Sequence, residues 1–179
     1  YVRMDSNGNF YIMTSSTGKE NDTLIKVNFD KNTSEVIYTT DMEKLYSLQS
    51  DGEYLYFFES TQSRETKSYF TAIDMNGTLK AQYEMEYDAE FLEKAKKFYE
   101  QFPEDTSVVV DASEICVYGI DERYILMGSN TNSDVYKNLK SLNSKPSKKV
   151  ITTGVGVINK MDYLNSGTAS IKQIYQNLS

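Results

Sequence analysis

Several residue types on which enzymes and metal sites depend are missing or scarce in this chain of 179 residues. It has no histidine and no tryptophan, one cysteine and two prolines. Histidine is the commonest general base and a frequent metal ligand. Its absence excludes Ser-His-Asp and Cys-His catalysis and histidine-based zinc sites. Catalysis by paired carboxylates, as in glycoside hydrolysis, stays open.

The single cysteine, the apolar runs and the net charge exclude further classes. Cys116 has no second cysteine with which to form an internal disulfide, and its place in ICVYG predicts a small buried hydrophobe in a strand. No stretch of about 18 apolar residues is present, which predicts no transmembrane segment. The net charge of −7 disfavours nucleic acid, because neutralising phosphates needs clustered Lys and Arg.

Alternating aromatic residues form the clearest pattern in the chain. In DGEYLYFFES, which begins at Asp51, aromatic side chains recur at every second position. Such alternation, bounded by Gly, Asn and Asp, predicts antiparallel strands. The Asn76-Gly77 pair predicts a tight hairpin turn, because both residue types tolerate positive φ. Tyrosine in these strands suits half-buried packing, and it also offers aromatic platforms for a carbohydrate ligand.

A related pattern precedes this stretch at a spacing of 44 residues. The shift needs no gap and places these residues on one another: Asn7 on Asp51, Gly8 on Gly52, Phe10 on Tyr54, Tyr11 on Leu55 and Ile12 on Tyr56. A gapless match over a whole segment favours an internal repeat.

A third copy lies about 70 residues after the second, with Asp121 on Asp51 and Tyr124 on Tyr54. We assign the later strands of this copy to 135–142 and 149–153. The extra length matches an insertion between the second and third copies. One β-repeat domain over 1–179 is therefore predicted, with these parts: copies at about 1–42, 43–86 and 113–153, a helical insertion at 87–112, and a partial copy or tail at 154–179.

A period near 44 residues with about four strands per unit is typical of a β-propeller blade. The chain resembles the β-propeller superfamily, in particular the divergent repeat propellers of bacterial secreted and surface proteins. The resemblance covers roughly residues 1–153 and rests on DGEYLYF, TAIDMNG and their shifted counterparts. It implies an all-β fold with one inserted helix, as a propeller-like array of three to four antiparallel blades. A β-sandwich is the alternative, because its strands recur at similar spacing.

Three copies are too few for a closed propeller, which needs at least four blades. An open array leaves a bare apolar sheet face, which favours association. We therefore expect a homo-oligomer, or the remainder of a longer chain, to complete the ring.

The insertion carries the clearest helix pattern. Apolar residues from Phe91 to Phe102 recur at the spacing of one helix face. Asp88 suits the N-cap position, and Pro103 ends the helix. Because this face must pack against the sheet or against a partner, its end is a candidate binding surface, formed by Phe98, Tyr99 and Phe102.

Two acidic residues are further binding candidates. Asp51 and Asp121 occupy matching positions in two copies, and in a propeller such residues converge near one end of the ring. Aspartate at a turn also forms side-chain-to-backbone hydrogen bonds, and this turn role is the favoured interpretation.

These observations favour a non-enzymatic binding or scaffold module of a bacterial extracellular or surface protein, with a protein or carbohydrate ligand. They predict no catalytic residue, no metal site and no cofactor. Two alternatives stay open. One is a segment of a carbohydrate-active enzyme with two carboxylates in one cleft. The other is a sensory ectodomain that reports ligand binding through the inserted helix.

Overall fold

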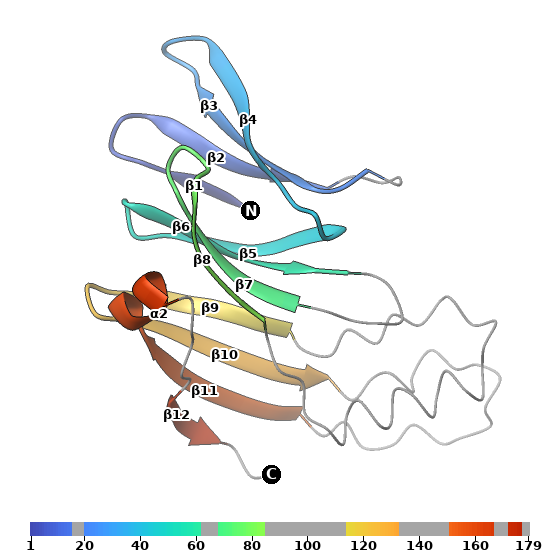
Figure 1. Cartoon of the computed structure of the whole chain (residues 1–179), viewed down its shortest axis with the longest axis vertical. Coiled ribbons are helices and arrows are strands. Elements are labelled where there is room, and N and C mark those ends of the chain that lie inside the picture. Colours follow the sequence, from blue (N-terminus) through green and yellow to red (C-terminus); the bar gives the residue numbers. More distant parts are fainter. Residues whose placement is uncertain (16–19, 62–67, 85–113, 133–150, 167–171, 177–179) are drawn as a thin grey trace, which may run out of the picture.

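The computed structural model shows a chain built mostly of β-strands (Figure 1). It describes residues 1–15, 20–61, 68–84, 114–132, 151–166 and 172–176. The strands in this part form three four-stranded antiparallel sheets, and one short helix accompanies them. The all-β prediction is therefore confirmed. The described residues form no closed barrel and no closed ring of sheets.

Each sheet is a meander, in which consecutive strands are hydrogen-bonded neighbours. The first sheet contains β1 (Val2–Met4), β2 (Asn9–Thr14), β3 (Thr23–Asn28) and β4 (Thr33–Thr39). The second contains β5 (Lys44–Ser50), β6 (Tyr54–Ser60), β7 (Ser68–Asp74) and β8 (Leu79–Glu84). The third contains β9 (Glu114–Ile120), β10 (Tyr124–Asn132), β11 (Ile151–Asn159) and β12 (Lys172–Gln176).

The sheets stack in chain order, with the second between the other two (Figure 1). Two apolar clusters hold the stack together, and the second sheet contributes to both. Toward the first sheet it buries Leu45, Leu48, Leu55, Phe57 and Ile73 against Tyr11 and Leu24. Toward the third sheet it buries Tyr56, Phe58, Phe70, Ala72 and Ala81 against Val117, Ile125, Met127 and Ile158. Full burial of a Val, Leu, Ile, Phe or Met side chain contributes about 1.5–3 kcal/mol to the stability of the folded chain.

The strands β1, β5 and β9 lie next to one another and are joined by hydrogen bonds through the stack. Arg3 Nε donates to Gln49 Oε1 at 3.1 Å, and Gln49 Nε2 donates to the Val117 carbonyl at 3.1 Å. The Val117 N–H in turn donates to Ser47 Oγ at 3.2 Å. Ser47 has a φ of 61° and lies in a bulge of β5, so the irregular backbone places its hydroxyl toward β9.

The helix α2 (Lys160–Ser166) follows β11 directly and packs on the second sheet. Asn159 Oδ1 accepts the Asp162 N–H at 3.1 Å, as an N-cap side chain does. Tyr163 is fully buried, and its hydroxyl donates to the carbonyls of Phe70 at 2.8 Å and Ala81 at 3.2 Å. This tyrosine fixes α2 against the core shared by the second and third sheets.

The end of the third sheet differs from the sequence assignment. The strand expected at 149–153 overlaps the start of β11, which pairs with β10 and extends to Asn159. The segment expected at 135–142 lies outside the described residues. The fourth strand of the sheet is β12, so parts of the predicted tail at 154–179 belong to the third sheet. The glycines in GVGV removed the regular apolar alternation by which the part of β11 after Thr153 would have been recognised.

The predicted register between the first two sheets is wrong by one residue. A shift of 44 places Tyr11 on Leu55, whereas in the structure Tyr11 corresponds to Tyr56. Both tyrosines are fully buried, and each donates its hydroxyl to the aspartate of its own hairpin turn. The β2 residues on both sides of Tyr11 are also apolar, so either register matches apolar residues with one another.

The inserted helix expected at 87–112 lies outside the described residues. Within the described part of the chain, no helix has the length and apolar character needed to cross a membrane.

Candidate functional site

Three hairpin turns lie on the same side of the stack, and an aspartate stabilises each of them (Figure 1). Asp5 accepts the N–H groups of Asn7 and Asn9 at 2.8 and 2.9 Å. Asp51 accepts those of Glu53 and Tyr54, and Asp121 accepts those of Arg123 and Tyr124. We call this side of the molecule, marked by Asp5, Asp51 and Asp121, the turn edge.

Both oxygens of Asp51 accept hydrogen bonds. Oδ1 accepts the two turn N–H groups at 2.8 and 3.0 Å, while Oδ2 accepts the Tyr56 hydroxyl at 2.9 Å and Lys160 Nζ at 3.0 Å. Burial raises the pKa of this carboxyl, but the hydrogen bonds outweigh burial and leave the pKa below its ordinary value. Asp51 therefore holds its turn, anchors a core tyrosine and pairs with Lys160 at the start of α2.

Asp121 is exposed and accepts the N–H groups of Arg123 at 2.7 Å and Tyr124 at 2.6 Å. These two bonds lower the pKa of the carboxyl, and the positive charges of Arg123 and Lys160 add to the effect. The structure thus brings Asp51 and Asp121 to the same edge, with the charge of Lys160 acting on both. Each carboxylate is engaged by its own turn, which is the favoured turn role.

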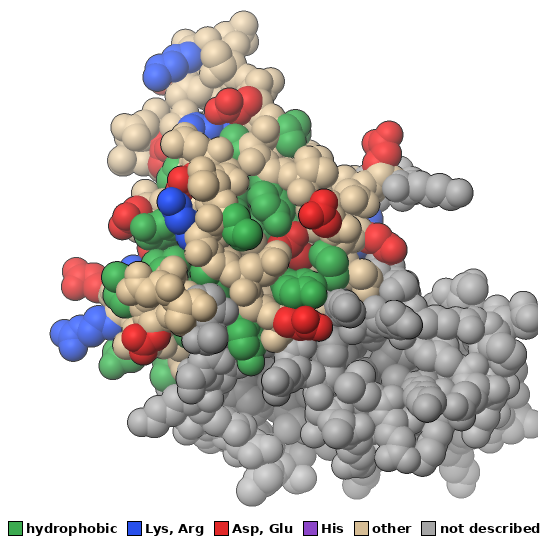
Figure 2. Space-filling view, in the orientation of Figure 1, with side chains coloured by type: hydrophobic (Ala, Val, Ile, Leu, Met, Phe, Trp, Pro, Cys, Tyr) green, Lys and Arg blue, Asp and Glu red, His purple; other side chains and the backbone are tan. Residues whose placement is uncertain are grey.

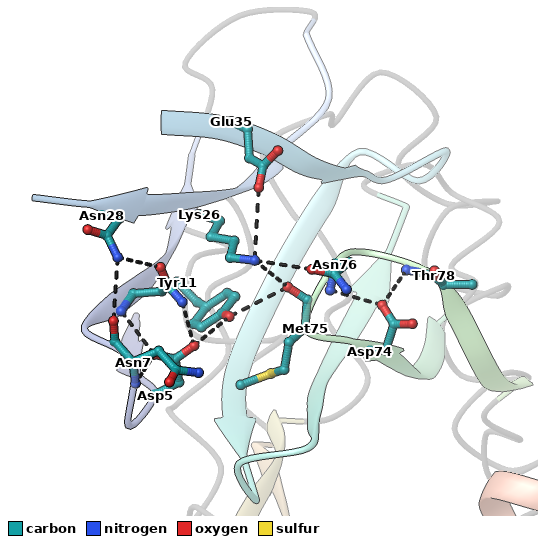
Figure 3. Close-up of polar contacts among 11 residues, drawn as sticks. Asp5, Asn7, Tyr11, Lys26, Asn28, Glu35, Asp74, Met75, Asn76 and Thr78 are labelled. Atoms are coloured by element: carbon teal, nitrogen blue, oxygen red, sulfur yellow. Dashed lines mark hydrogen bonds and ion pairs between the residues drawn. The ribbon is translucent and has the colours of Figure 1, made fainter. Parts of the chain in front are cut away.

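A polar cluster at the turn edge joins the first two sheets (Figure 3). Lys26 Nζ, from β3, lies 3.3 Å from the Met75 carbonyl and 3.2 Å from Asn76 Oδ1, in the turn between β7 and β8. Glu35 lies 3.9 Å from the same ammonium group. The Tyr11 hydroxyl donates to Asp5 at 3.0 Å and lies 3.5 Å from the Met75 carbonyl. These contacts fix the first sheet on the second at this end.

A buried carboxylate joins the same two sheets through β6. Glu59 is 1% exposed. Its oxygens accept hydrogen bonds from the hydroxyls of Tyr38 in β4 and of Thr40, which directly follows β4, and from Thr71 and Gln82 of the second sheet. A buried carboxylate with this many donors is satisfied in place. The interface between the first and second sheets is therefore apolar in its centre and polar at the turn edge and around Glu59.

The opposite face of the first sheet carries an apolar surface. Strand pairing places seven apolar side chains on this side, and we call them the open face: Val2, Met4, Phe10, Ile12, Ile25, Val27 and Val36. Val2 is 49% exposed, Met4 64% and Val36 59%, and the other four are partly exposed. A contiguous apolar patch of this kind is characteristic of an interaction surface.

Charged side chains show no comparable clustering on the side drawn in Figure 2. Lys and Arg side chains there are interspersed with Asp, Glu and uncharged residues. Among the described residues, no group of three or more Cys, Asp or Glu side chains is placed to hold a metal ion. Apolar surface on the first sheet is therefore the feature with the clearest binding character.

The candidate residues from the sequence have different outcomes. Phe98, Tyr99 and Phe102 lie outside the described residues. Asp51 and Asp121 lie on one edge, where they accept hydrogen bonds from their turns. Tyr56 and Phe58 are fully buried and thus not available as platforms for a carbohydrate. The sequence reasoning did not identify the open face. The signal for it is that segments 10–13 and 24–27 carry apolar residues on both faces of the strand.

No protein-family model, curated protein or solved structure matches this chain.

Proposed function

We propose that the chain is a non-catalytic scaffold and binding module, in which four-stranded sheets stack as propeller-like repeats and the open face binds a protein partner. The exposure of the open face is the observation that carries this proposal. The other residues that strand pairing places on this face, Thr14, Thr23 and Ser34, are uncharged, so a partner that covers the face desolvates no charge on this chain. Buried apolar area contributes about 25 cal/mol per Å².

The chemistry of the open face favours a protein partner over a carbohydrate. Six of its seven side chains are aliphatic or Met, and the seventh, Phe10, packs edge-on against the exposed ring of Phe29, with ring centroids 5.2 Å apart, rather than lying flat as an open platform. Aliphatic and Met side chains pack well in protein interfaces and cores, whereas recognition of sugar rings uses aromatic platforms. The secreted or surface setting on a bacterial cell remains part of this proposal and is supported by the resemblance of the sequence to propellers of that kind.

The hydrogen bonding of Asp51 and Asp121 favours a scaffold over the carbohydrate-active alternative. A glycosidase needs one carboxyl as acid and a second as base or nucleophile. Each of these two carboxylates instead accepts two backbone N–H groups of its own turn. This arrangement lowers both pKa values, which opposes the role of general acid.

The variant Asp51→Asn distinguishes the scaffold proposal from the carbohydrate-active alternative. Asn retains an acceptor oxygen for the turn, but its amide nitrogen does not accept the hydrogen bond from Lys160. We expect the thermal midpoint to fall, by a loss of about 1–2 kcal/mol in the free energy of unfolding, with no change in hydrolysis of a chromogenic glycoside panel. Asp121→Asn, which keeps its exposed turn and the Lys160 contact to Asp51, is the matched control. The scaffold proposal would be contradicted if the wild type hydrolysed a glycoside and Asp51→Asn abolished this hydrolysis without changing the thermal midpoint.

Dye binding tests the open face itself. We expect an environment-sensitive apolar dye to gain fluorescence with the dilute wild-type chain, and Val36→Glu to reduce that gain. Asn165→Glu, which adds the same charge at an exposed position of α2, is the control and leaves the gain unchanged. Equal fluorescence from all three proteins would refute an accessible apolar face.

A further inference from the structure

The two interfaces in the stack use faces of two kinds. We call the face of a sheet that points toward the next sheet in the chain its forward face, and the opposite face its backward face. In both interfaces, the forward face of one sheet packs on the backward face of the next. Tyr11 and Leu24 on the forward face of the first sheet pack with Leu55 and Phe57 on the backward face of the second. The forward face of the second sheet packs in the same manner on the third, where Ile125 is buried.

One face of each kind is left at the ends of the stack. The open face is the backward face of the first sheet. On the forward face of the third sheet, Leu126 and Val157 are strand partners, on the side opposite Ile125 and Ile158. Both are partly exposed, and Tyr124 on the same side of β10 is 44% exposed. The described part of the chain thus presents apolar side chains at both ends.

We propose that the open face of one copy binds the forward face of the third sheet of a second copy. This inference depends on the proposed function, because it names the partner of the open face. Within one chain, the forward face of each sheet packs on the backward face of the next. The proposed contact between copies repeats this packing. The occupant of the open face is then a sheet of the same kind as those that cover the corresponding face of the second and third sheets.

Such a contact joins two different surfaces and is therefore heterologous. Repetition of a heterologous contact closes a ring when the rotation allows it and otherwise extends the assembly. Neither the seven side chains of the open face nor Tyr124, Leu126 and Val157 carry a charge. The edge strand β12 pairs Lys172 with Val157, so the contact avoids the costly desolvation of a charged group where it is centred on β10 and β11.

The test is the solution mass of the full chain, measured by light scattering over a wide range of concentrations. We expect the wild type to reach at least twice the mass of one chain. Val36→Glu places a charge on the open face and Tyr124→Glu places one on the forward face of the third sheet, so each variant alone is expected to remain monomeric. Both positions are exposed in the monomer, and a cooperative melt verifies folding. Asn165→Glu adds the same charge on α2 and is expected to associate like the wild type.

A mixture of the two variants tests the head-to-tail arrangement. Val36→Glu retains an intact third sheet, and Tyr124→Glu retains an intact open face. An equimolar mixture is therefore expected to form a dimer of one chain of each variant, although neither associates alone. Association of Tyr124→Glu by itself, or of Val36→Glu by itself, would overturn the proposal, and so would a mixture that stays monomeric.

A wild type that is monomeric at every concentration would also overturn the inference, and dye binding then shows whether the proposed function fails with it. A monomer whose dye fluorescence falls in Val36→Glu has an accessible apolar face for a partner other than a second copy. A monomer without dye binding has no such face, and the proposed function fails as well.

Discussion

The first and second sheets have the same strand order but differ in how their backward faces are covered. In the second sheet this face contains Leu55 and Phe57, and both are fully buried by the first sheet. In the first sheet the corresponding face contains Phe10 and Ile12, which remain partly exposed. Apolar residues occur in both places, so the difference lies in the neighbour rather than in the strand itself.

This difference shows which parts of the sequence stabilise the isolated chain and which are available for binding. The second sheet is covered on both faces and needs apolar residues at successive positions of β6. The first sheet buries one apolar face against the second sheet, whereas among the described residues the side chains of its open face pack only on neighbours within their own sheet. Apolar side chains that no other described sheet covers in the isolated chain are the physical basis for the proposed binding function.

The largest expected effect compares two corresponding positions. Phe57 is fully buried between the first two sheets, so Phe57→Ala is expected to lower the free energy of unfolding by about 3–5 kcal/mol. Ile12 occupies the corresponding position on the open face, and Ile12→Ala in the dilute chain is expected to lower it by less than about 1 kcal/mol. Chemical denaturation monitored by tyrosine fluorescence measures both values. Equal losses would show that the open face is covered within the chain.

A pair of glycines tests the contact between the same two sheets. Gly77 and Gly52 have φ values of 91° and 93°, so alanine introduces a similar backbone strain of about 1 kcal/mol at each. A Cβ at Gly77 would lie 1.9 Å from the Ile37 carbonyl oxygen of the first sheet, whereas nothing lies within 4 Å of one at Gly52. We expect Gly77→Ala to cost about 2–4 kcal/mol and Gly52→Ala about 1 kcal/mol.

Thermal or chemical denaturation of the two glycine variants measures this difference. Similar losses would mean that the turn between β7 and β8 does not lie against β4 in solution, and the close contact of the first and second sheets would then be wrong.

The smallest expected effect concerns acid stability. The pKa values of Asp5 and Asp51 lie below the ordinary value of 3.8 in the folded chain. Their contribution is therefore complete above about pH 4 and is lost as the pH falls through the folded-state pKa values. The free energy of unfolding should therefore fall between about pH 5 and pH 2. In Asp5→Asn and in Asp51→Asn it should fall less steeply over this range than in the wild type. An unchanged slope in both variants would contradict the turn role.

At neutral pH the same two variants compare the first two turns. The donors to Asp5 are two backbone N–H groups, the Asn9 amide and the Tyr11 hydroxyl, whereas Asp51 also accepts from the Lys160 ammonium. Both carboxylates are charged, but only the Lys160–Asp51 bond has a charged group on each side, and such bonds are the stronger ones. Asp51→Asn is therefore expected to lower the thermal midpoint more than Asp5→Asn.

Much of the strand content could be predicted from the sequence, because alternation and turn residues act locally. Tyr56 and Leu55 were correctly placed on opposite faces of one strand, and the hairpin at Gly77 occurs as predicted. Register between sheets was less certain, since apolar residues on both faces of β2 fit two adjacent alignments. The strand expected at 149–153 overlaps the start of β11, but its extension to Asn159 was missed because glycines weaken the strand pattern. The helix α2 was missed because it is only seven residues long.

The candidate site was harder to predict for a different reason. Whether a sheet face is covered depends on the number and order of the sheets, which alternation in one strand does not encode. Asp51 was recognised as a turn residue, but its pairing with Lys160 depends on a contact 109 residues apart in the chain. The sequence predicts that an incomplete array leaves one apolar sheet face exposed. The residues that form this face could be identified only from the pairing of the strands.

Oxidative footprinting of two methionines tests the central claim most directly. Met4, on the open face, is 64% exposed, and Met127, in the core between the second and third sheets, is 3% exposed. In the dilute, folded chain we expect mass spectrometry after brief exposure to hydroxyl radicals to show rapid oxidation of Met4 and protection of Met127. Protection of Met4 in the monomer to the same degree as Met127 would mean that the open face is covered within the chain, which would contradict the account.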